Sequence, residues 1–256
     1  MKVAILGGAG RMGQMLLTCA EELGVRVVAV TEAPGSPLIG KPAFHDRFYQ
    51  CTWPDEADTI VDFTARACVA PNLRNAARLG QAYVLGTTGL TEEDLAAVRE
   101  AAKAIPICFA PNFSLGVNLL FELTRRAAEV LDASYDAEIV EMHHRHKKDA
   151  PSGTALGLAR AVAQGRGVAL DEVAVYGRHG MPGERPAGEI GLHALRGGSV
   201  VGDHMVMFAA EEERVEIVHK AVSRAAFAKG ALKAAAWLQG REPGLYAMRH
   251  VLGFEG

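Results

Sequence analysis

The first half of the chain alternates short runs of β-branched residues with longer segments of helical periodicity. The predicted strands are residues 3–6, 25–31, 59–63, 83–85 and 107–109, and the predicted helices are residues 12–23, 71–79 and 92–104. Parallel strands need crossover connections long enough to hold a helix, and this rhythm supplies them. The pattern therefore predicts an α/β domain whose parallel sheet has helices on both faces.

The pattern changes after residue 136. The next predicted strands follow one another with one clear helix between them, at 152–164, and they are residues 136–144, 173–176, 190–196, 199–209 and 214–219. Such a succession is typical of an α+β domain. A long amphipathic helix at 223–238 follows, and we expect it to pack back on the first sheet. We therefore predict a first domain of residues 1–113 plus 223–256 and a second domain of residues 114–222.

Composition and charge narrow the class of partner. The 256 residues are 49% hydrophobic and 22% charged, which excludes a disordered or collagen-like chain. A net charge of −3 lacks the basic excess of proteins that bind nucleic acid or anionic membranes, so we expect a small-molecule partner instead. The chain has no run of 18 apolar residues and no signal-peptide pattern, and its four cysteines form no C-x-x-C pair. These features predict a cytoplasmic protein with reduced cysteines.

A glycine-rich turn follows the first predicted strand and opens the first predicted helix, with the sequence Gly7-Gly8-Ala9-Gly10-Arg11-Met12-Gly13. Glycines permit a tight turn and let a pyrophosphate approach the N–H groups of the helix. Glu32 lies at the end of the second predicted strand, where a carboxylate accepts hydrogen bonds from ribose hydroxyls. This order of elements predicts a Rossmann-type dinucleotide site, and the alternative is a glycine-rich turn that binds no ligand.

Two other strand ends carry small residues of the same kind. They are Gly86-Thr87-Thr88-Gly89 and Ala110-Pro111-Asn112-Phe113. In an open parallel sheet the ligand lies at the carboxyl ends of the strands, so we expect both segments to border the nicotinamide ring. The alternative for the first segment is a plain turn into a helix capped by Thr91.

The densest cluster of candidate residues is the segment 141–154, with the sequence EMHHRHKKDAPSGT, at the end of a strand and the start of a helix. The N–H groups of a helix that starts at Ser152-Gly153-Thr154, with Lys147 nearby, would bind a carboxylate or phosphate. His143 and His144 point to opposite faces of the strand unless the strand is ending there, so we expect different roles for them. The alternatives are a solvated basic corner and a metal site. No acidic or cysteine partner stands at ligand spacing, so we expect no metal.

Several segments of the chain resemble the dihydrodipicolinate reductases, also called 4-hydroxy-tetrahydrodipicolinate reductases. The resemblance covers nearly the whole chain, and the block 141–154, continuing into Ala155, is close to a family signature. The matching segments are 7–13, 62–64, 86–89, 110–114, 141–154, 183–185 with Gly188 and 190–191, 201–204, and 219–221.

This resemblance implies an NAD(P)H-dependent oxidoreductase of lysine and diaminopimelate biosynthesis that reduces a cyclic dicarboxylate. It also implies a homotetramer formed through the second domain. The implied roles are proton donor or acceptor for His143, second donor for Lys147, and carboxylate binding for His144, Gly153 and Thr154. The residues expected to hold the cofactor are Gly7, Gly8, Ala9, Gly10, Arg11, Met12, Glu32, Gly86, Thr87, Thr88, Ala110, Pro111, Asn112 and Phe113.

The residue after Glu32 bears on the choice of cofactor. Many relatives have Arg at this position, where this chain has Ala33. Without that guanidinium, Glu32 repels a 2′-phosphate, so we expect use of both coenzymes with NADH at least as good as NADPH. Two further interpretations stay open, a nucleotide-sensing protein without turnover and another Rossmann reductase such as a semialdehyde or homoserine dehydrogenase.

Overall fold

The computed structural model describes residues 1–254 and falls into two units. Unit 1 consists of Met1–Leu115 together with the described residues from Arg224 onward, and unit 2 is Gly116–Ser223. The predicted division at residues 113 and 223 lies close to these boundaries. Within residues 1–254, no helix is long and apolar enough to cross a membrane.

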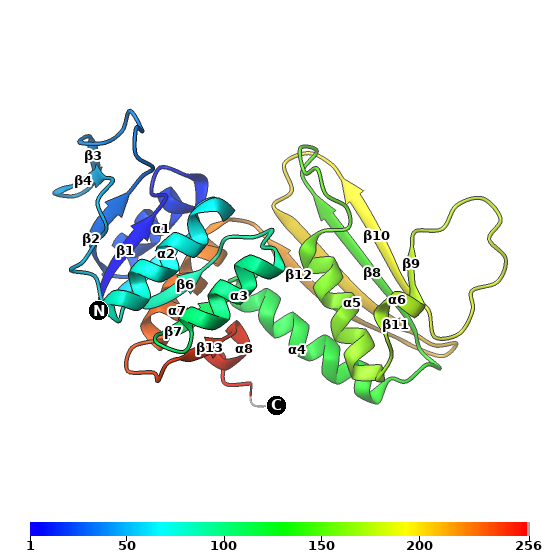
Figure 1. Cartoon of the computed structure of the whole chain (residues 1–256). Coiled ribbons are helices and arrows are strands. Elements are labelled where there is room, and N and C mark those ends of the chain that lie inside the picture. The colour runs from blue at the N-terminus through cyan, green and yellow to red at the C-terminus, as the bar shows by residue number, and fades with distance from the viewer. Residues whose placement is uncertain (255–256) are drawn as a thin grey trace. The chain divides into compact units, whose positions relative to one another are not determined.

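Unit 1 is built on an eight-stranded sheet in the order β13-β7-β6-β5-β1-β2-β4-β3 (Figure 1). All the pairings from β13 to β4 are parallel, and only the edge pair of β3 and β4 is antiparallel. Every residue of β5 and β6 is buried, as expected for central strands with helices on both faces. The strands are β1 (Lys2–Leu6), β2 (Arg26–Thr31), β3 (Pro42–Phe44), β4 (Arg47–Gln50), β5 (Thr59–Asp62), β6 (Ala82–Leu85), β7 (Pro106–Phe109) and β13 (Gly244–Tyr246).

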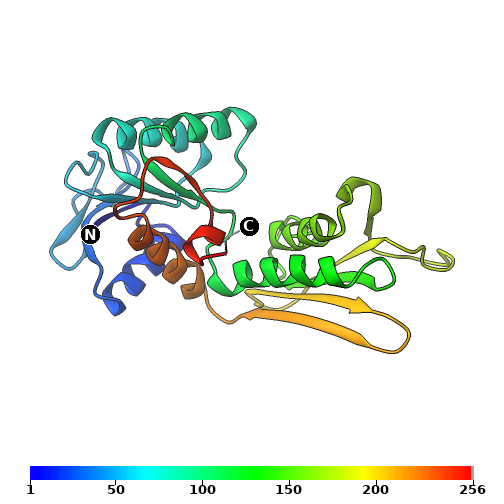
Figure 2. The same ribbon diagram turned by 90° about the horizontal axis from the view of Figure 1, so that it is seen from below.

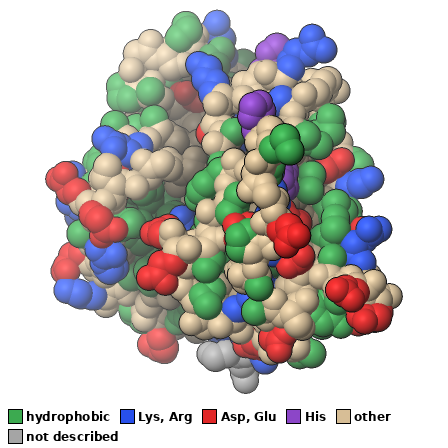
Figure 3. All heavy atoms as spheres, turned by 90° about the vertical axis from the view of Figure 1, so that its right-hand side faces the viewer, with side chains coloured by type: hydrophobic (Ala, Val, Ile, Leu, Met, Phe, Trp, Pro, Cys, Tyr) green, Lys and Arg blue, Asp and Glu red, His purple; other side chains and the backbone are tan. Residues whose placement is uncertain are grey.

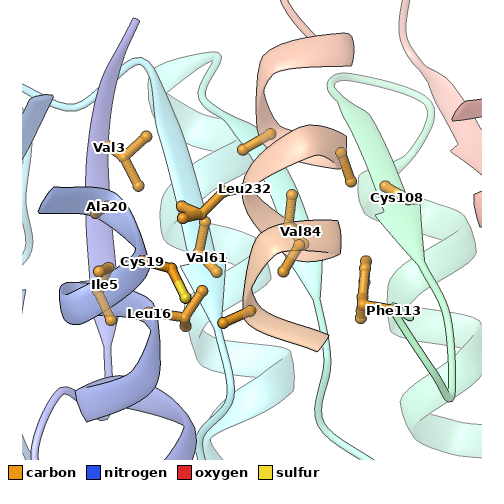
Figure 4. Close-up of a cluster of buried hydrophobic side chains, with 14 of the residues drawn as sticks. Val3, Ile5, Leu16, Cys19, Ala20, Val61, Val84, Cys108, Phe113 and Leu232 are labelled. Atoms are coloured by element: carbon orange, nitrogen blue, oxygen red, sulfur yellow. The ribbon is translucent and has the colours of Figure 1, made fainter. Parts of the chain in front are cut away.

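Helices cover both faces of this sheet (Figure 2). On one face lie α1 (Arg11–Glu22), α7 (Ala225–Trp237) and α8 (Met248–Val251), and on the other lie α2 (Arg66–Leu79) and α3 (Glu92–Ala101). Figure 4 shows Leu232 of α7 packed with Leu16 of α1 over Val61 of the sheet. The return of the chain in α7 thus completes the core of unit 1.

Unit 2 is a five-stranded mixed sheet in the order β12-β11-β8-β10-β9. Its central strand β8 runs parallel to β10 and antiparallel to β11. Helices α4 and α5 cover one face only (Figure 2), packing on alternate residues of β8 and β11. The elements are α4 (Leu115–Val130), β8 (Asp136–His143), α5 (Gly153–Arg166), α6 (Leu170–Val173), β9 (Ala174–Tyr176), β10 (Ile190–Arg196), β11 (Gly202–Ala209) and β12 (Arg214–Ala221).

The elements depart from the sequence-based prediction in several places, and the short elements α6, β13 and α8 were not predicted at all. The predicted start of α2 at Pro71 is wrong, because the helix begins at Arg66 and the buried Val69 and Leu73 hold it despite the proline inside it. Strands β3 and β4 are short and surrounded by glycine and proline, so they leave no alternating pattern. Helix α4 was not among the predicted elements, since it lies between the α/β pattern of the first half of the chain and the α+β pattern that begins at residue 136. The capping of α3 by Thr91 is confirmed, with its hydroxyl accepting from the N–H of Asp94.

Candidate functional site

The turn between β1 and α1 in unit 1 leaves no room for a side chain at Gly8 or at Gly13. Gly7 has a φ of 73°, a conformation that glycine adopts readily. A Cβ on Gly8 would lie 2.1 Å from Cγ1 of Val30, and a Cβ on Gly13 would lie 2.3 Å from the carbonyl oxygen of Gly7. The backbone of the turn is therefore as close to β2 and α1 as a dinucleotide site requires.

Glu32 stands directly after β2 and is tied to the glycine-rich turn. Its Oε1 accepts a hydrogen bond of 2.7 Å from the N–H of Ala9. A cavity of about 620 Å³ opens at this point, and its lining includes Gly7, Gly10 and Glu32 as well as the aromatic ring of Trp53. Apolar walls beside a carboxylate fit a nucleoside, whose base is flat and whose ribose carries hydroxyl donors.

The strand ends after β6 and β7 lie side by side, because these strands pair in parallel. Thr87 is buried and donates to the carbonyl oxygen of Thr64 at 3.1 Å. That loop is fixed by Asp62, which is 0% exposed and accepts from the Thr64 N–H at 2.7 Å and from Tyr83 Oη at 2.5 Å. Burial and the charge of Asp62 raise the pKa of Tyr83, so its hydroxyl stays protonated and donates.

The predicted substrate residues gather in unit 2, where β8 ends and α5 begins. His143 is the last residue of β8, and Gly153 and Thr154 are the first two residues of α5. His144 and Lys147 lie between these elements, so the alternation of faces along β8 ends before His144. Figure 3 shows histidine side chains close to lysine and arginine side chains in the upper part of one face.

Lys147 is paired within this segment. Its Nζ lies 2.9 and 2.8 Å from the two carboxylate oxygens of Asp149. The hydrogen bond from Lys147 lowers the pKa of Asp149 below its usual range. An incoming carboxylate would therefore compete with Asp149 for this ammonium group.

Glu141 is a buried carboxylate to which the sequence assigned no role. It lies two residues before His143 on the same face of β8 and is 1% exposed. Its Oε2 lies 2.5 Å from Nδ1 of His143, and the guanidinium of Arg196 donates to both oxygens at 2.9 Å. The N–H of Ser152 donates to Oε1 at 3.1 Å. One carboxylate thus joins the ends of β8 and β10 to the start of α5.

These donors keep Glu141 ionised. Burial alone would raise its pKa, but the hydrogen bonds from Arg196, His143 and Ser152 outweigh burial and hold the pKa below its usual range. An ionised carboxylate can only accept hydrogen bonds, and all its neighbours in this network are donors.

The ring of His204 packs against the ring of His143 in the same unit. The two rings meet edge to face with centroids 5.1 Å apart, and His204 is 4% exposed. Its Nε2 lies 3.2 Å from Oγ of Ser152, which caps α5 by accepting from the N–H of Ala155. Burial, with the neighbouring His143, lowers the pKa of His204 to about 4, so this ring is neutral at neutral pH.

Sequence reasoning missed the roles of Glu141, Arg196 and His204. An acid two residues before a candidate catalytic histidine on one strand is a usable signal, and it points to Glu141. Arg196 and His204 reach the site only through the register of β10 and β11 with β8, which no local pattern reveals. Among residues 1–254, no three His, Cys, Asp or Glu side chains are grouped so as to hold a metal ion.

Comparisons with known proteins cover both units. Family models described as the N-terminus and the C-terminus of dihydrodipicolinate reductase match residues 1–113 and 116–252. Proteins named 4-hydroxy-tetrahydrodipicolinate reductase from Granulibacter bethesdensis and Thiobacillus denitrificans are each 49% identical, over 99% and 100% of this chain and 97% and 99% of theirs.

A solved structure shares the fold. It is a dipicolinate-bound dihydrodipicolinate reductase from Paenisporosarcina sp. TG-14, with a TM-score of 0.77 and 24% identity over 96% of this chain and 97% of the other. A probable dehydrogenase from Thermotoga maritima is similar with a TM-score of 0.62, at 10% identity over 98% of this chain and 92% of the other.

We expect acid to destabilise the fold through His204. The folded-state pKa of about 4 lies below the ordinary value of 6.5, so between these pH values the unfolded chain binds a proton that the folded chain does not. The free energy of unfolding therefore falls as the pH drops from 6.5 towards 4, by on the order of 3 kcal/mol over the interval. Urea unfolding at both ends of the interval measures the change.

The matched variants are His204→Gln and His179→Gln. The first removes the titrating ring and should make the loss of stability smaller, whereas the second lies in an exposed loop and should leave the pH dependence as in the wild type. An unchanged dependence in His204→Gln would contradict the assignment to this residue.

Proposed function

The chain belongs to the dihydrodipicolinate reductase family, and on that premise we propose which of its residues carry out the family's reaction. The protein is an oxidoreductase of lysine (diaminopimelate) biosynthesis. It reduces the dihydrodipicolinate (4-hydroxy-tetrahydrodipicolinate) ring to tetrahydrodipicolinate with a reduced pyridine nucleotide. The observation that carries the residue assignment is the hydrogen bond between the buried Glu141 and Nδ1 of His143.

Unit 1 is the part of the chain that we propose to hold the cofactor. The tight turn at residues 7–12 leads into α1, whose first N–H groups suit the pyrophosphate, and Glu32 accepts from the ribose hydroxyls. Segments 86–88 and 110–113, at neighbouring strand ends, border the nicotinamide. When bound, the reduced nicotinamide supplies the hydride, and the chain supplies orientation.

The dicarboxylate substrate is proposed to bind at the start of α5. The N-terminus of a helix carries partial positive charge, so the start of α5 at Gly153 and Thr154 suits a carboxylate. His144 and Lys147 add hydrogen-bond donors and positive charge from the preceding segment. The structure of the similar Paenisporosarcina protein was solved with dipicolinate bound. Dipicolinate is a planar ring with two carboxylates, as the proposed substrate is a ring with two carboxylates.

His143 is the proposed proton donor. Reduction of the conjugated imine at C4 of the ring leaves C3 electron-rich, and this carbon must take up a proton. An imidazole serves as general acid at neutral pH. Because Nδ1 of His143 is engaged with Glu141, Nε2 is the nitrogen left to deliver the proton. Lys147 neutralises a carboxylate and so makes the ring a better hydride acceptor.

Assembly as a homotetramer is proposed for the face of the unit 2 sheet that α4 and α5 do not cover. This face carries apolar side chains, among them Leu195 and Val218, which are 50% and 49% exposed. Sedimentation equilibrium measures the mass of the assembly directly.

We also propose a cytoplasmic location, since all four cysteines are free, as in a reducing compartment.

The proton-donor role predicts a large loss of turnover in His143→Gln. We expect kcat to fall by about two orders of magnitude or more with little change in KM, since general acid catalysis supplies ~10²–10⁴-fold. Lys147→Ala should impair both parameters. The assay generates the substrate from aspartate semialdehyde and pyruvate with the preceding synthase and follows the absorbance of the reduced nicotinamide.

Matched controls are substitutions of an exposed histidine and an exposed lysine, His179→Gln and Lys148→Ala, which should keep wild-type rates. Near wild-type kcat in His143→Gln would reject this residue as the proton donor. A wild-type chain that binds nucleotide but oxidises none with substrate would favour the sensing alternative instead.

Coenzyme choice gives a second prediction. Glu32 favours free ribose hydroxyls, and Ala33 offers no guanidinium to a 2′-phosphate, so NADH should serve at least as well as NADPH. Ala33→Arg should raise kcat/KM with NADPH while leaving the NADH value little changed. Initial rates with both coenzymes decide the matter. A wild-type kcat/KM with NADPH more than about tenfold above that with NADH would reject the prediction.

A further inference from the structure

The hydrogen bonds around Glu141 determine which nitrogen of His143 carries a proton. Oε2 of Glu141 lies 2.5 Å from Nδ1 of His143 and also accepts from Arg196. An ionised carboxylate has no proton to give, so Nδ1 must be the protonated nitrogen. In the neutral ring Nε2 is then left with its lone pair, and after protonation it is the nitrogen that can release the proton.

The surroundings of Nε2 are consistent with that arrangement. A Cβ on Gly202 would lie 3.0 Å from Nε2 of His143, so a side chain at this position would crowd that nitrogen. The other ring packed against His143 is that of His204, whose Nε2 is directed at Ser152 and not at His143.

The same carboxylate also fixes the start of α5. Its Oε1 accepts from the N–H of Ser152, the residue that caps this helix. Arg196 donates to both oxygens and to the carbonyl oxygen of Asp149 at 2.7 Å, so the connecting segment is held from the β10 side as well. Glu141 therefore holds the proposed proton donor and the proposed carboxylate site in one orientation.

We propose that Glu141 is a positioning residue that holds His143 in the Nδ1–H form, with Nε2 aimed at the substrate, while anchoring the start of α5. The inference rests on the proposed role of His143. The role resembles that of the buried carboxylate in hydrolytic triads, where a carboxylate sets the tautomer of a histidine without itself taking up the proton.

Glu141→Gln tests this at constant volume. The two donors at the Oε1 position, the N–H of Ser152 and Nη2 of Arg196, cannot become acceptors. At the Oε2 position Nη1 of Arg196 likewise stays a donor, but the His143 ring can move its proton and accept, so the amide oxygen of the new side chain is favoured at Oε1. The amide NH₂ then occupies the Oε2 position and donates to Nδ1 of His143. The ring must therefore move its proton to Nε2, so the substitution should invert the tautomer.

Glu138→Gln is the matched control. Glu138 lies on the same strand but on the opposite face of the sheet, and it too binds a histidine and an arginine, with Oε2 at 2.7 Å from His193 and Oε1 at 2.9 Å from Arg185. Glu138→Gln therefore measures how much activity is lost when a hydrogen-bonded carboxylate is removed from β8 at a position that does not contact His143.

The first measurement is ¹⁵N NMR of the full chain labelled at its histidines, at a pH where the His143 ring is neutral. The His143 resonances are assigned by their absence in His143→Gln. The expected result is Nδ1–H in the wild type and in Glu138→Gln, and Nε2–H in Glu141→Gln. An Nε2–H ring in the wild type, or an unchanged tautomer in Glu141→Gln, would overturn the inference whatever the activity.

The second measurement is a double-mutant cycle on kcat. Glu141→Gln should lower kcat by about two orders of magnitude, and by a larger factor than any rise in KM. In the His143→Gln background it should cost little more, because Glu141 acts through His143. Equal losses in both backgrounds would show a merely structural role. If Glu141→Gln inverts the tautomer but leaves kcat unchanged, the effect of Glu141 on the His143 tautomer is supported and His143 is rejected as the proton donor.

Discussion

Removing a carboxylate from water costs several kcal/mol unless charged and hydrogen-bonding partners replace the solvent, and Glu141 imposes this condition on unit 2. Its partners come from three elements: His143 from the end of β8, Arg196 from the end of β10 and Ser152 from the cap of α5. If any one of these elements moved away, the buried carboxylate would lose one of its hydrogen-bond donors. The hydrogen bonds that compensate the buried charge of Glu141 therefore also hold His143 next to the N-terminus of α5. Reduction of a dicarboxylate needs both, a proton donor and a site for a carboxylate.

Unit 1 reaches its binding geometry by a different physical route. There the constraint is steric, because Gly8 and Gly13 lie so close to β2 and to the turn itself that no side chain fits. Charge contributes through Glu32 on the N–H of Ala9 and through the buried Asp62 that fixes the loop after β5. Both units place their candidate residues at strand ends and helix starts, where backbone N–H groups and side chains converge on one point.

The sequence predicts features that depend on neighbours along the chain. The glycine-rich turn, Glu32, the parallel α/β pattern and the segment 141–154 are all local, and each was identified without a structure. Arg196 and His204 were not, because they meet His143 only through the order β11-β8-β10, in which sheet neighbours are distant in sequence. Helix α4 was missed at the change of pattern. Glu141 lay within a recognised segment, yet its burial depends on α5 and β10, so its role could not be assigned from residue type.

The central claim is that one buried carboxylate, Glu141, holds a proton donor and a carboxylate-binding site in a fixed position relative to each other. A crystal structure of the wild-type protein with dipicolinate tests it most directly. The account predicts a ligand carboxylate on the N–H groups of Gly153 and Thr154, Lys147 on the ligand, the ring next to Nε2 of His143, and the bonds of Glu141 unchanged. Dipicolinate bound away from the start of α5, or a Glu141 separated from His143 in the complex, would contradict it.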